Sequence, residues 1–185
     1  MFITSNDHRS MIAIADGAGG TGGGSAASRM VCEAVEACAN HEGLVDWSQV
    51  LCDVDEAIAA DHEAGWSTGV IVEVYAGEIR GASVGDSRAL LITNDRIEDL
   101  TEHQRAKPLL GTTQSLPVYF GPHPVMPQAV ILVATDGLFD AVKLEVVQAC
   151  LDRSNLDESA RRLLHTAQLP SGNYSDDVTI ALMTS

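Results

Sequence analysis

Apolar residues recur along the chain in two different rhythms, and each rhythm predicts a different kind of element. Runs that are continuously apolar or that alternate with polar residues predict β-strands, whereas apolar residues three and four apart predict amphipathic helices. We expect strands at 11–15, 67–75, 79–84, 89–93, 96–100, 130–135 and 178–184. We expect helices after Ser25, a residue suited to cap a helix, and at 46–62, 143–152 and 157–168.

The order of these elements predicts the fold class. The strands between residues 67 and 100 follow one another with short turns at Ala76-Gly77 and Asn94-Asp95, so we expect them to pair antiparallel. Helices in pairs and strands in runs imply an α+β fold rather than an alternating βαβ fold. We therefore predict a four-layer αββα sandwich, in which two antiparallel β-sheets are flanked by helix pairs. Residues 101–128 hold five of the six prolines and are expected to form an irregular connection.

Length and composition indicate a globular protein. With 185 residues, 45% hydrophobic and 20% charged, the chain is expected to form one domain over residues 1–185, with residues 1–10 as a short irregular N-terminus. The net charge of −15 argues against nucleic acid or an anionic membrane as a partner. The sequence shows no signal peptide and no apolar run near 18 residues, and its four cysteines form no Cys-x-x-Cys pair. We therefore expect a cytoplasmic protein with reduced thiols.

Acidic residues stand at the ends of three predicted strands. Asp16-Gly17 and Asp136-Gly137 each follow an apolar run, and Asp176-Asp177 precedes the last strand. A strand end is a rigid position for a carboxylate, and these three sites are far apart in the sequence. We expect folding to assemble them into one site for a hard cation. Oxygen ligands of this kind suit Mg²⁺ or Mn²⁺ rather than Zn²⁺, and the six histidines show no paired spacing for zinc.

The glycine-rich loop that follows Asp16 allows other hypotheses. Residues 17–22 match G-x-G-x-x-G between a strand and a helix, which is the context of a dinucleotide-binding fingerprint. Against this hypothesis, the next element reads as a helix, and Asp16 would repel a pyrophosphate. A Walker A loop is disfavoured because no Lys follows the glycines. Taken alone the loop favours a strand-to-helix turn without a ligand, but together with Asp136 and Asp176 it favours a metal site.

Several short motifs stand in a defined order along residues 11–185. They are Ala15-Asp16-Gly17-Ala18-Gly19-Gly20, Ala27-Ser28, Ser67-Thr68-Gly69, Val84-Gly85-Asp86-Ser87-Arg88, Leu100-Thr101, Thr135-Asp136-Gly137-Leu138-Phe139-Asp140 and Asp176-Asp177-Val178-Thr179. In this order the chain resembles the metal-dependent serine/threonine protein phosphatases of the type-2C (PPM) family, in their bacterial form. Each motif is weak by itself, but the ordered set is specific.

The resemblance implies a ligand set and a reaction. Asp16 would bridge two Mn²⁺ or Mg²⁺ ions, the Gly17 carbonyl would bind one of them, and Asp136 and Asp176 would complete the set. These three aspartates are the expected catalytic residues. Asp86, with Asp136, would hold a third, weaker ion. The implied activity is the hydrolysis of phosphoserine or phosphothreonine on a phosphorylated protein substrate by metal-activated water, without a covalent enzyme intermediate.

The chain also departs from the family pattern. Family members usually carry an upstream strand with an Arg for phosphate and an acidic motif for the second metal, and we expect this strand to be missing here. Asn6-Asp7 lies too near Asp16 to replace the acidic motif, and Arg9 is a weak candidate for contacting phosphate. Ala18 stands where some eukaryotic members have His, and residues 101–111 are too short for the flap of many bacterial members.

These departures leave alternatives open. The first is a catalytically degenerate type-2C-like regulatory module that binds metal or a phosphoprotein partner without turnover. The second alternative is a nucleotide-binding protein, which predicts retention of a dinucleotide without divalent metal. Arg88 and Asp140 fit either a structural ion pair or cap, or a contact with substrate.

Overall fold

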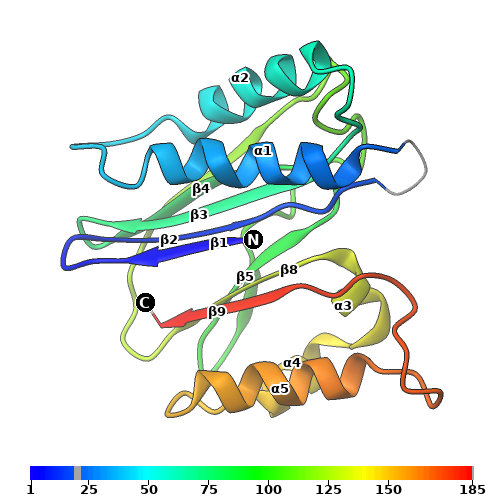
Figure 1. Ribbon diagram of the computed structural model, residues 1–185. Coiled ribbons are helices and arrows are strands. Elements are labelled where there is room, and N and C mark those ends of the chain that lie inside the picture. The colour runs from blue at the N-terminus through cyan, green and yellow to red at the C-terminus, as the bar shows by residue number, and fades with distance from the viewer. Residues whose placement is uncertain (19–21, 185) are drawn as a thin grey trace.

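Two stacked β-sheets form the centre of the computed structural model, which describes residues 1–18 and 22–184 (Figure 1). The first sheet has the order β1-β2-β3-β4-β7, with neighbours antiparallel. Its strands are β1 (Phe2–Ser5), β2 (Arg9–Ile14), β3 (Gly69–Tyr75), β4 (Glu78–Val84) and β7 (Val118–Pro124). The second sheet has the order β6-β5-β8-β9, also antiparallel. Its strands are β5 (Arg88–Ile92), β6 (Ile97–Asp99), β8 (Val130–Ala134) and β9 (Ile180–Thr184).

Helices cover the outer face of each sheet. The first sheet carries α1 (Gly24–Ala37) and α2 (Trp47–Ala60), and the second carries α3 (Asp136–Ala141), α4 (Leu144–Cys150) and α5 (Leu156–Ala167) (Figure 1). This arrangement confirms the predicted αββα sandwich. It adds α3, which is only six residues long and therefore too short to show a helical period in the sequence.

Strand β2 is buried on both faces, and this explains its continuous apolar run. Met11 and Ala13 pack in the apolar cluster beneath α1 and α2. Ile12 and Ile14 alternate with them and pack in the cluster between the two sheets. Successive side chains of a strand point to opposite faces, so a strand in an inner layer needs apolar residues at every position. β2 thereby runs through the interior and ends just before Asp16.

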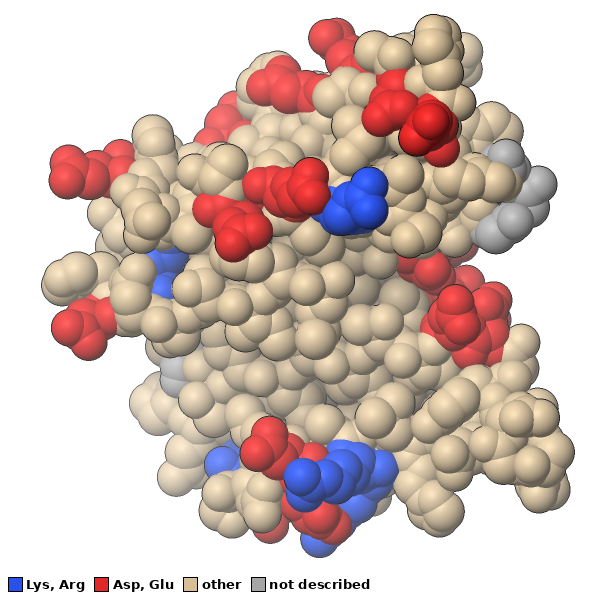
Figure 2. All heavy atoms as spheres, in the orientation of Figure 1, with Lys and Arg blue, Asp and Glu red and all other residues tan. Residues whose placement is uncertain are grey.

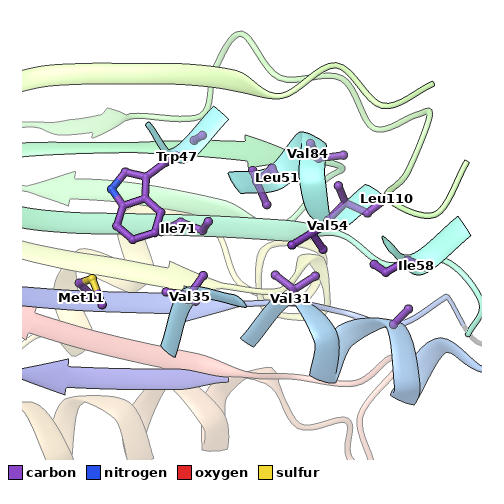
Figure 3. Packing of buried hydrophobic residues seen from close by; sticks show 13 residues of the cluster. Met11, Val31, Val35, Trp47, Leu51, Val54, Ile58, Ile71, Val84 and Leu110 are labelled. Atoms are coloured by element: carbon purple, nitrogen blue, oxygen red, sulfur yellow. The ribbon is translucent and has the colours of Figure 1, made fainter. Parts of the chain in front are cut away.

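The cluster beneath α1 and α2 follows the helical spacing seen in the sequence. Val31 and Val35 from α1, and Trp47 and Leu51 from α2, are fully buried against the strands and approach Ile71 of β3 (Figure 3). Each pair on a helix is four residues apart, which places both members on one face. Burying a side chain of this size contributes about 1.5–3 kcal/mol each. This packing holds α1 and α2 against the sheet.

Two edge strands differ from the sequence prediction. Residues 1–10 are not an irregular N-terminus, because β1 pairs antiparallel with β2, with Phe2 opposite Ala13 and Ser5 opposite Ser10. The predicted irregular connection is also wrong over β7, which pairs with β4 although it contains Pro122 and Pro124. β7 is the last strand of its sheet, and an edge position tolerates proline because the missing N–H need not serve a ladder.

Two further expectations concern the membrane and the thiols. Among residues 1–18 and 22–184, no helix combines the length and the hydropathy that crossing a bilayer requires. Cys32, Cys38, Cys52 and Cys150 are free thiols, each half-buried rather than fully enclosed.

Candidate functional site

Asp16 follows the inner strand β2, and the chain just before β3 fixes its backbone. The Thr68 N–H donates to the Asp16 carbonyl at 2.8 Å, and the Asp16 N–H donates to Thr68 Oγ1 at 3.0 Å. Ser67 Oγ also donates to the Asp16 carbonyl at 3.0 Å. Asp16 itself is half-buried. Its position is therefore set by two buried residues of a neighbouring segment.

The same threonine connects Asp16 to the segment that carries Asp86. Thr68 Oγ1 and Ser87 Oγ share a hydrogen bond of 2.8 Å, and both side chains are buried. Asp86 directly precedes Ser87 in the turn between β4 and β5, and its side chain is exposed. One buried hydroxyl pair thus holds two acidic segments side by side.

A second hydroxyl clamp holds Asp136, the first residue of α3, beside the acidic loop that precedes β9. Thr135 Oγ1 donates to the Asp177 carbonyl at 2.9 Å and accepts from the Thr179 N–H at 3.0 Å. Gly137 permits the close contact, because a Cβ there would lie 2.6 Å from the Asp177 carbonyl oxygen. The loop is therefore pinned against the end of β8 by backbone contacts that do not depend on its carboxylates.

Together these segments line one pocket of about 240 Å³. The lining residues are Asp16, Gly17, Ala18, Thr68, Asp86, Leu109, Asp136, Asp176 and Asp177. The structure thus brings together all five residues predicted as metal ligands, and it adds Asp177. Acidic side chains gather on the right of the view, at the edge where the upper and lower halves of the molecule meet (Figure 2).

Burial and mutual repulsion both act on these carboxylates. Loss of solvent and, to a smaller extent, the charges of Asp136, Asp176, Asp177 and Asp86 together raise the pKa of Asp16 to about 6. Burial also raises the pKa of Asp136, with Asp86 as the strongest charged contributor, while a hydrogen bond from the Gly137 N–H partly opposes the shift. Both carboxyls are thus less acidic than usual, because burial and neighbouring negative charge both disfavour ionisation.

The pocket suits a hard divalent cation in its donor chemistry, since its acidic side chains offer only oxygen ligands. A bound cation would also relieve the repulsion that raises the pKa values of Asp16 and Asp136. The ligands are nevertheless not preassembled: within the described part of the chain, no three Asp, Glu, His or Cys side chains are grouped closely enough to enclose an ion. The carboxylates share a pocket, and binding would require them to move inward.

Gly17 is suited to its position by the absence of a side chain. A Cβ at Gly17 would lie 2.2 Å from the carbonyl oxygen of Gly24, the first residue of α1. This contact brings the start of α1 next to Asp16, where Ser25 and Ser28 line an adjoining pocket of about 440 Å³. The rest of the glycine-rich loop, residues 19–21, lies outside the described residues.

A family model described as "Stage II sporulation protein E (SpoIIE)" matches residues 6–185. The chain belongs to the SpoIIE family. This match, together with the solved structures that share the fold, confirms the resemblance to the type-2C phosphatases. No significant match was found among curated protein sequences.

Solved structures of bacterial phosphatases share the fold of this SpoIIE-family chain. A variant of a bacterial serine phosphatase superposes with a TM-score of 0.81 at 23% identity, covering 98% of this chain and 88% of that one. The serine/threonine phosphatase PstP/Ppp of Mycobacterium tuberculosis gives 0.76 at 20%, covering 98% and 89%. The catalytic domain of PstP in complex with two manganese ions gives 0.73 at 19%, covering 98% and 88%. At these identities the likeness shows a common fold.

Arg9 does not reach the acidic pocket of this SpoIIE-family protein, so its suggested contact with phosphate is wrong. It begins β2 whereas Asp16 follows the end of β2, and seven residues of extended chain span roughly 20 Å. Its guanidinium is buried and held by neighbouring groups: Nε pairs with Glu73 at 2.9 Å, Nη1 donates to the His41 carbonyl at 2.6 Å, and Nη2 donates to the Gly43 carbonyl. Arg9 therefore stabilises the opposite end of the molecule.

Arg88 and Asp140, for which the sequence allowed either a structural role or a contact with substrate, have different surroundings. Arg88 makes a structural ion pair with Asp99, donating from Nε at 2.9 Å and from Nη2 at 2.5 Å, and its guanidinium stacks on the Phe139 ring at 4.8 Å. Asp140 is exposed at the end of α3, and its charge contributes to the raised pKa of Asp136. None of the histidines lines the acidic pocket over the range that the structure describes.

Some residues of the site were not identified as such from the sequence. Asp177 adjoins a predicted ligand, so its adjacency to Asp176 was the available signal. Thr68 and Thr135 lie within the recognised motifs, but only their hydrogen bonds to distant segments show that they position the acidic residues. Leu109 carries no motif, and nothing in the sequence marks it as a pocket residue.

Proposed function

We propose that the acidic pocket binds two divalent cations, Mn²⁺ or Mg²⁺, and that the chain hydrolyses phosphoserine or phosphothreonine on proteins. The observation that carries this proposal is the convergence of five aspartates on one pocket, where burial and the charges of the other four raise the pKa of Asp16. Membership of the SpoIIE family and the shared fold with PstP, whose catalytic domain has been solved with two manganese ions, support it. The bound cations would polarise the phosphoryl group and lower the pKa of the attacking water.

The protein's own residues would act by holding charge in place. Asp16 and Asp136 would bind the cations as carboxylates, with the Gly17 carbonyl and Asp176 as further ligands. Asp86, together with Asp136, would hold the third and weaker ion. Asp86, Asp176 and Asp177 are exposed, so the pocket opens to solvent and a phosphorylated side chain on a folded protein could enter it.

The test is Mn²⁺-dependent hydrolysis of p-nitrophenyl phosphate and of a phosphoserine peptide. We expect activity in the wild type and a fall to background in Asp16→Asn and in Asp136→Asn, because each change removes a ligand charge. Asp95→Asn is the matched control, since Asp95 is exposed in the turn at the other end of β5 and also loses one negative charge. Circular dichroism would show that each variant is folded.

A second function is favoured by two observations. Within residues 1–18 and 22–184 the ligands are not preassembled, and Arg9 is remote from the pocket. A regulatory module that binds metal or a phosphoprotein without turnover would have both features. It predicts that isothermal titration detects Mn²⁺ or phosphopeptide binding while no hydrolysis occurs at any Mn²⁺ concentration.

A further inference from the structure

Positive charge is scarce on this protein, and most of it is already paired. The chain has 11 lysines and arginines and a net charge of −15. Seven arginines form ion pairs with acidic side chains: Arg9, Arg29, Arg80, Arg88, Arg96, Arg161 and Arg162. Among the described residues, the basic side chains without an ion pair are Arg105, Lys107, Lys143 and Arg153. Two of these four lie on one short segment, which runs beside the acidic pocket.

That segment is anchored to the pocket at both ends. At one end, the Gln104 side-chain amide donates to the Ser87 carbonyl at 2.7 Å, next to Asp86. At the other end, Leu109 lines the acidic pocket itself. The next residue, Leu110, exchanges two backbone hydrogen bonds with Ser67, at 2.9 and 3.1 Å.

The residues between these anchors cannot lie far from the pocket. Lys107 stands two residues and Arg105 four residues before Leu109, so even in a fully extended chain they lie at most roughly 7 Å and 14 Å from that pocket residue. Arg105 and Lys107 are both exposed, and both carry long, flexible side chains. Neither residue lines the acidic pocket in the structure, but each side chain is long enough to bring its charged end to the pocket rim when a substrate is present.

Positive charge at this rim would favour the binding of a phosphorylated substrate. A phosphoryl group carries negative charge near neutral pH, and it would approach the exposed carboxylates of Asp86, Asp176 and Asp177. Arg9 cannot supply the charge, because its donors are engaged at the far end of β2. Arg and Lys are the side chains that bind phosphate oxygens through charge-assisted hydrogen bonds.

We propose that Arg105 and Lys107 bind the phosphoryl group of the substrate at the rim of the acidic pocket. The proposal rests on the proposed function for its substrate class, and it assigns these two residues to substrate binding rather than to metal binding. It gives the connection between β6 and β7 a role in selecting phosphorylated over unphosphorylated protein.

The first test measures KM and kcat for p-nitrophenyl phosphate at saturating Mn²⁺. In the double variant Arg105→Ala/Lys107→Ala we expect KM to rise roughly 10-fold with kcat within about twofold, because an ionic hydrogen bond to the ground-state phosphoryl group is lost. The variant Arg105→Lys, which keeps the positive charge, should show a smaller rise in KM than the double variant. Arg29→Ala/Lys143→Ala is the matched control, since it removes the same charge from exposed residues outside the pocket lining.

The second test measures binding without turnover. Fluorescence anisotropy with a labelled phosphoserine peptide and Mn²⁺-loaded protein should show the same roughly 10-fold weakening, with Mn²⁺ affinity by calorimetry unchanged. If the wild type binds the phosphopeptide without hydrolysing it and the double variant binds it roughly 10-fold more weakly, the proposed hydrolysis fails while this assignment stands.

Three results would overturn the assignment. One is a double variant that matches the Arg29→Ala/Lys143→Ala control in both KM and peptide affinity. Another is weakened phosphopeptide binding with an unchanged KM for p-nitrophenyl phosphate, since Arg105 and Lys107 would then contact the peptide rather than the phosphoryl group. The third is a wild type that neither hydrolyses phosphate esters nor prefers the phosphorylated peptide over its unphosphorylated form.

Discussion

Asp16 occupies a position where its own negative charge is costly. It is half-buried, and four other aspartates act on it across the pocket. The fold nevertheless holds its backbone firmly through Ser67 and Thr68. A carboxylate fixed among like charges is an unfavourable arrangement that a cation would reverse. The residue is thus arranged for a ligand rather than for the stability of the metal-free protein.

This arrangement predicts how the stability of the metal-free protein depends on pH. The pKa of Asp16 is about 6 in the folded protein against 3.8 for the ordinary group, so between these values the folded state binds more protons than the unfolded state. Stability contributed by this group is therefore present at low pH and is lost as pH rises from about 4 to about 6. In EDTA, Asp16→Asn should be more stable than wild type at pH 7, by on the order of 1 kcal/mol after allowance for solvent exposure, and equal to it near pH 4.

Urea unfolding at a series of pH values measures this difference. The control is Asp95→Asn, which removes the same charge from an exposed turn and should show little of the pH dependence. With Mn²⁺ present the order should reverse, because the wild type then keeps its ligand. A metal-free Asp16→Asn that is less stable than wild type at pH 7 would contradict the explanation.

Thr68 should control metal affinity although it carries no charge. Replacing it with Val keeps the shape but leaves the Asp16 N–H and the Ser87 hydroxyl without their partner. We expect Thr68→Val to lower stability by about 1–3 kcal/mol and Mn²⁺ affinity by roughly 10-fold, as for residues that orient ligands. Calorimetric titration with Mn²⁺ measures the affinity, and Thr68→Ser, which keeps the hydroxyl, should retain it. Equal affinities for Thr68→Val and Thr68→Ser would show that the clamp does not position Asp16.

At the scale of elements, α2 supports the pocket through a buried carboxylate. Asp55 is 4% exposed, and it accepts hydrogen bonds from the Gly111 N–H at 2.6 Å, the Thr113 N–H at 3.0 Å, and the N–H and hydroxyl of Ser115 at 3.1 and 2.6 Å. These bonds order the loop that follows Leu109, a pocket residue. The Asp55 side chain of α2 thereby holds in place the segment that forms one side of the pocket.

Asp55→Asn should loosen that wall. The amide has one acceptor oxygen, so its NH₂ would face the Ser115 N–H and that bond would be lost, while the Ser115 hydroxyl would have to change from donor to acceptor. We expect a loss of about 2–3 kcal/mol in the free energy of unfolding and faster hydrogen exchange at Gly111, Thr113 and Ser115. Glu56→Gln, on the exposed face of the same helix, is the matched control and should change neither. Unchanged exchange in Asp55→Asn would mean that the loop is held by other contacts.

The elements that the sequence did not reveal share a physical cause. The inner strands β2 and β8 could be predicted from their continuous apolar runs, because both of their faces are buried. Strands β1 and β7 lie at the two edges of the first sheet and expose alternate residues. The prolines of β7 are acceptable only because no further strand pairs with it in the described sheet, and a single sequence does not show which strand will be an edge. Pairing between distant segments is set by the whole fold.

The site residues likewise fall into those that a local motif identifies and those that only the folded structure identifies. Asp16, Gly17, Asp86, Asp136 and Asp176 could be named because each belongs to a short motif with its own chemistry. Thr68, Thr135 and Asp55 act through partners 19–60 positions away in the sequence. Arg9 was misplaced because a strand carries its two ends to opposite sides of the molecule.

At the scale of the whole molecule, the acidic pocket lies where the two sheets meet. Asp16 follows β2 of the first sheet, and Asp136 follows β8 of the second. A cation bound by both would connect the two halves of the sandwich, in a protein whose net charge of −15 already opposes compactness. Binding of a divalent cation should therefore raise the stability of the whole protein and not only order the site.

Divalent metal should raise the melting temperature through these two aspartates. At a free Mn²⁺ concentration 100 times the Kd, binding to the folded state adds about 2.7 kcal/mol, which corresponds to roughly 5–10 °C for a chain of this size. Differential scanning fluorimetry in Mn²⁺, in EDTA, and in NaCl of equal ionic strength separates specific binding from charge screening, since NaCl should reproduce only a small part of the shift. Asp16→Asn/Asp136→Asn should lose the Mn²⁺-specific part while melting as a folded protein. An equal Mn²⁺ shift in that variant would place the bound metal elsewhere on the acidic surface, and the two sheets would then be held together by their apolar contacts alone.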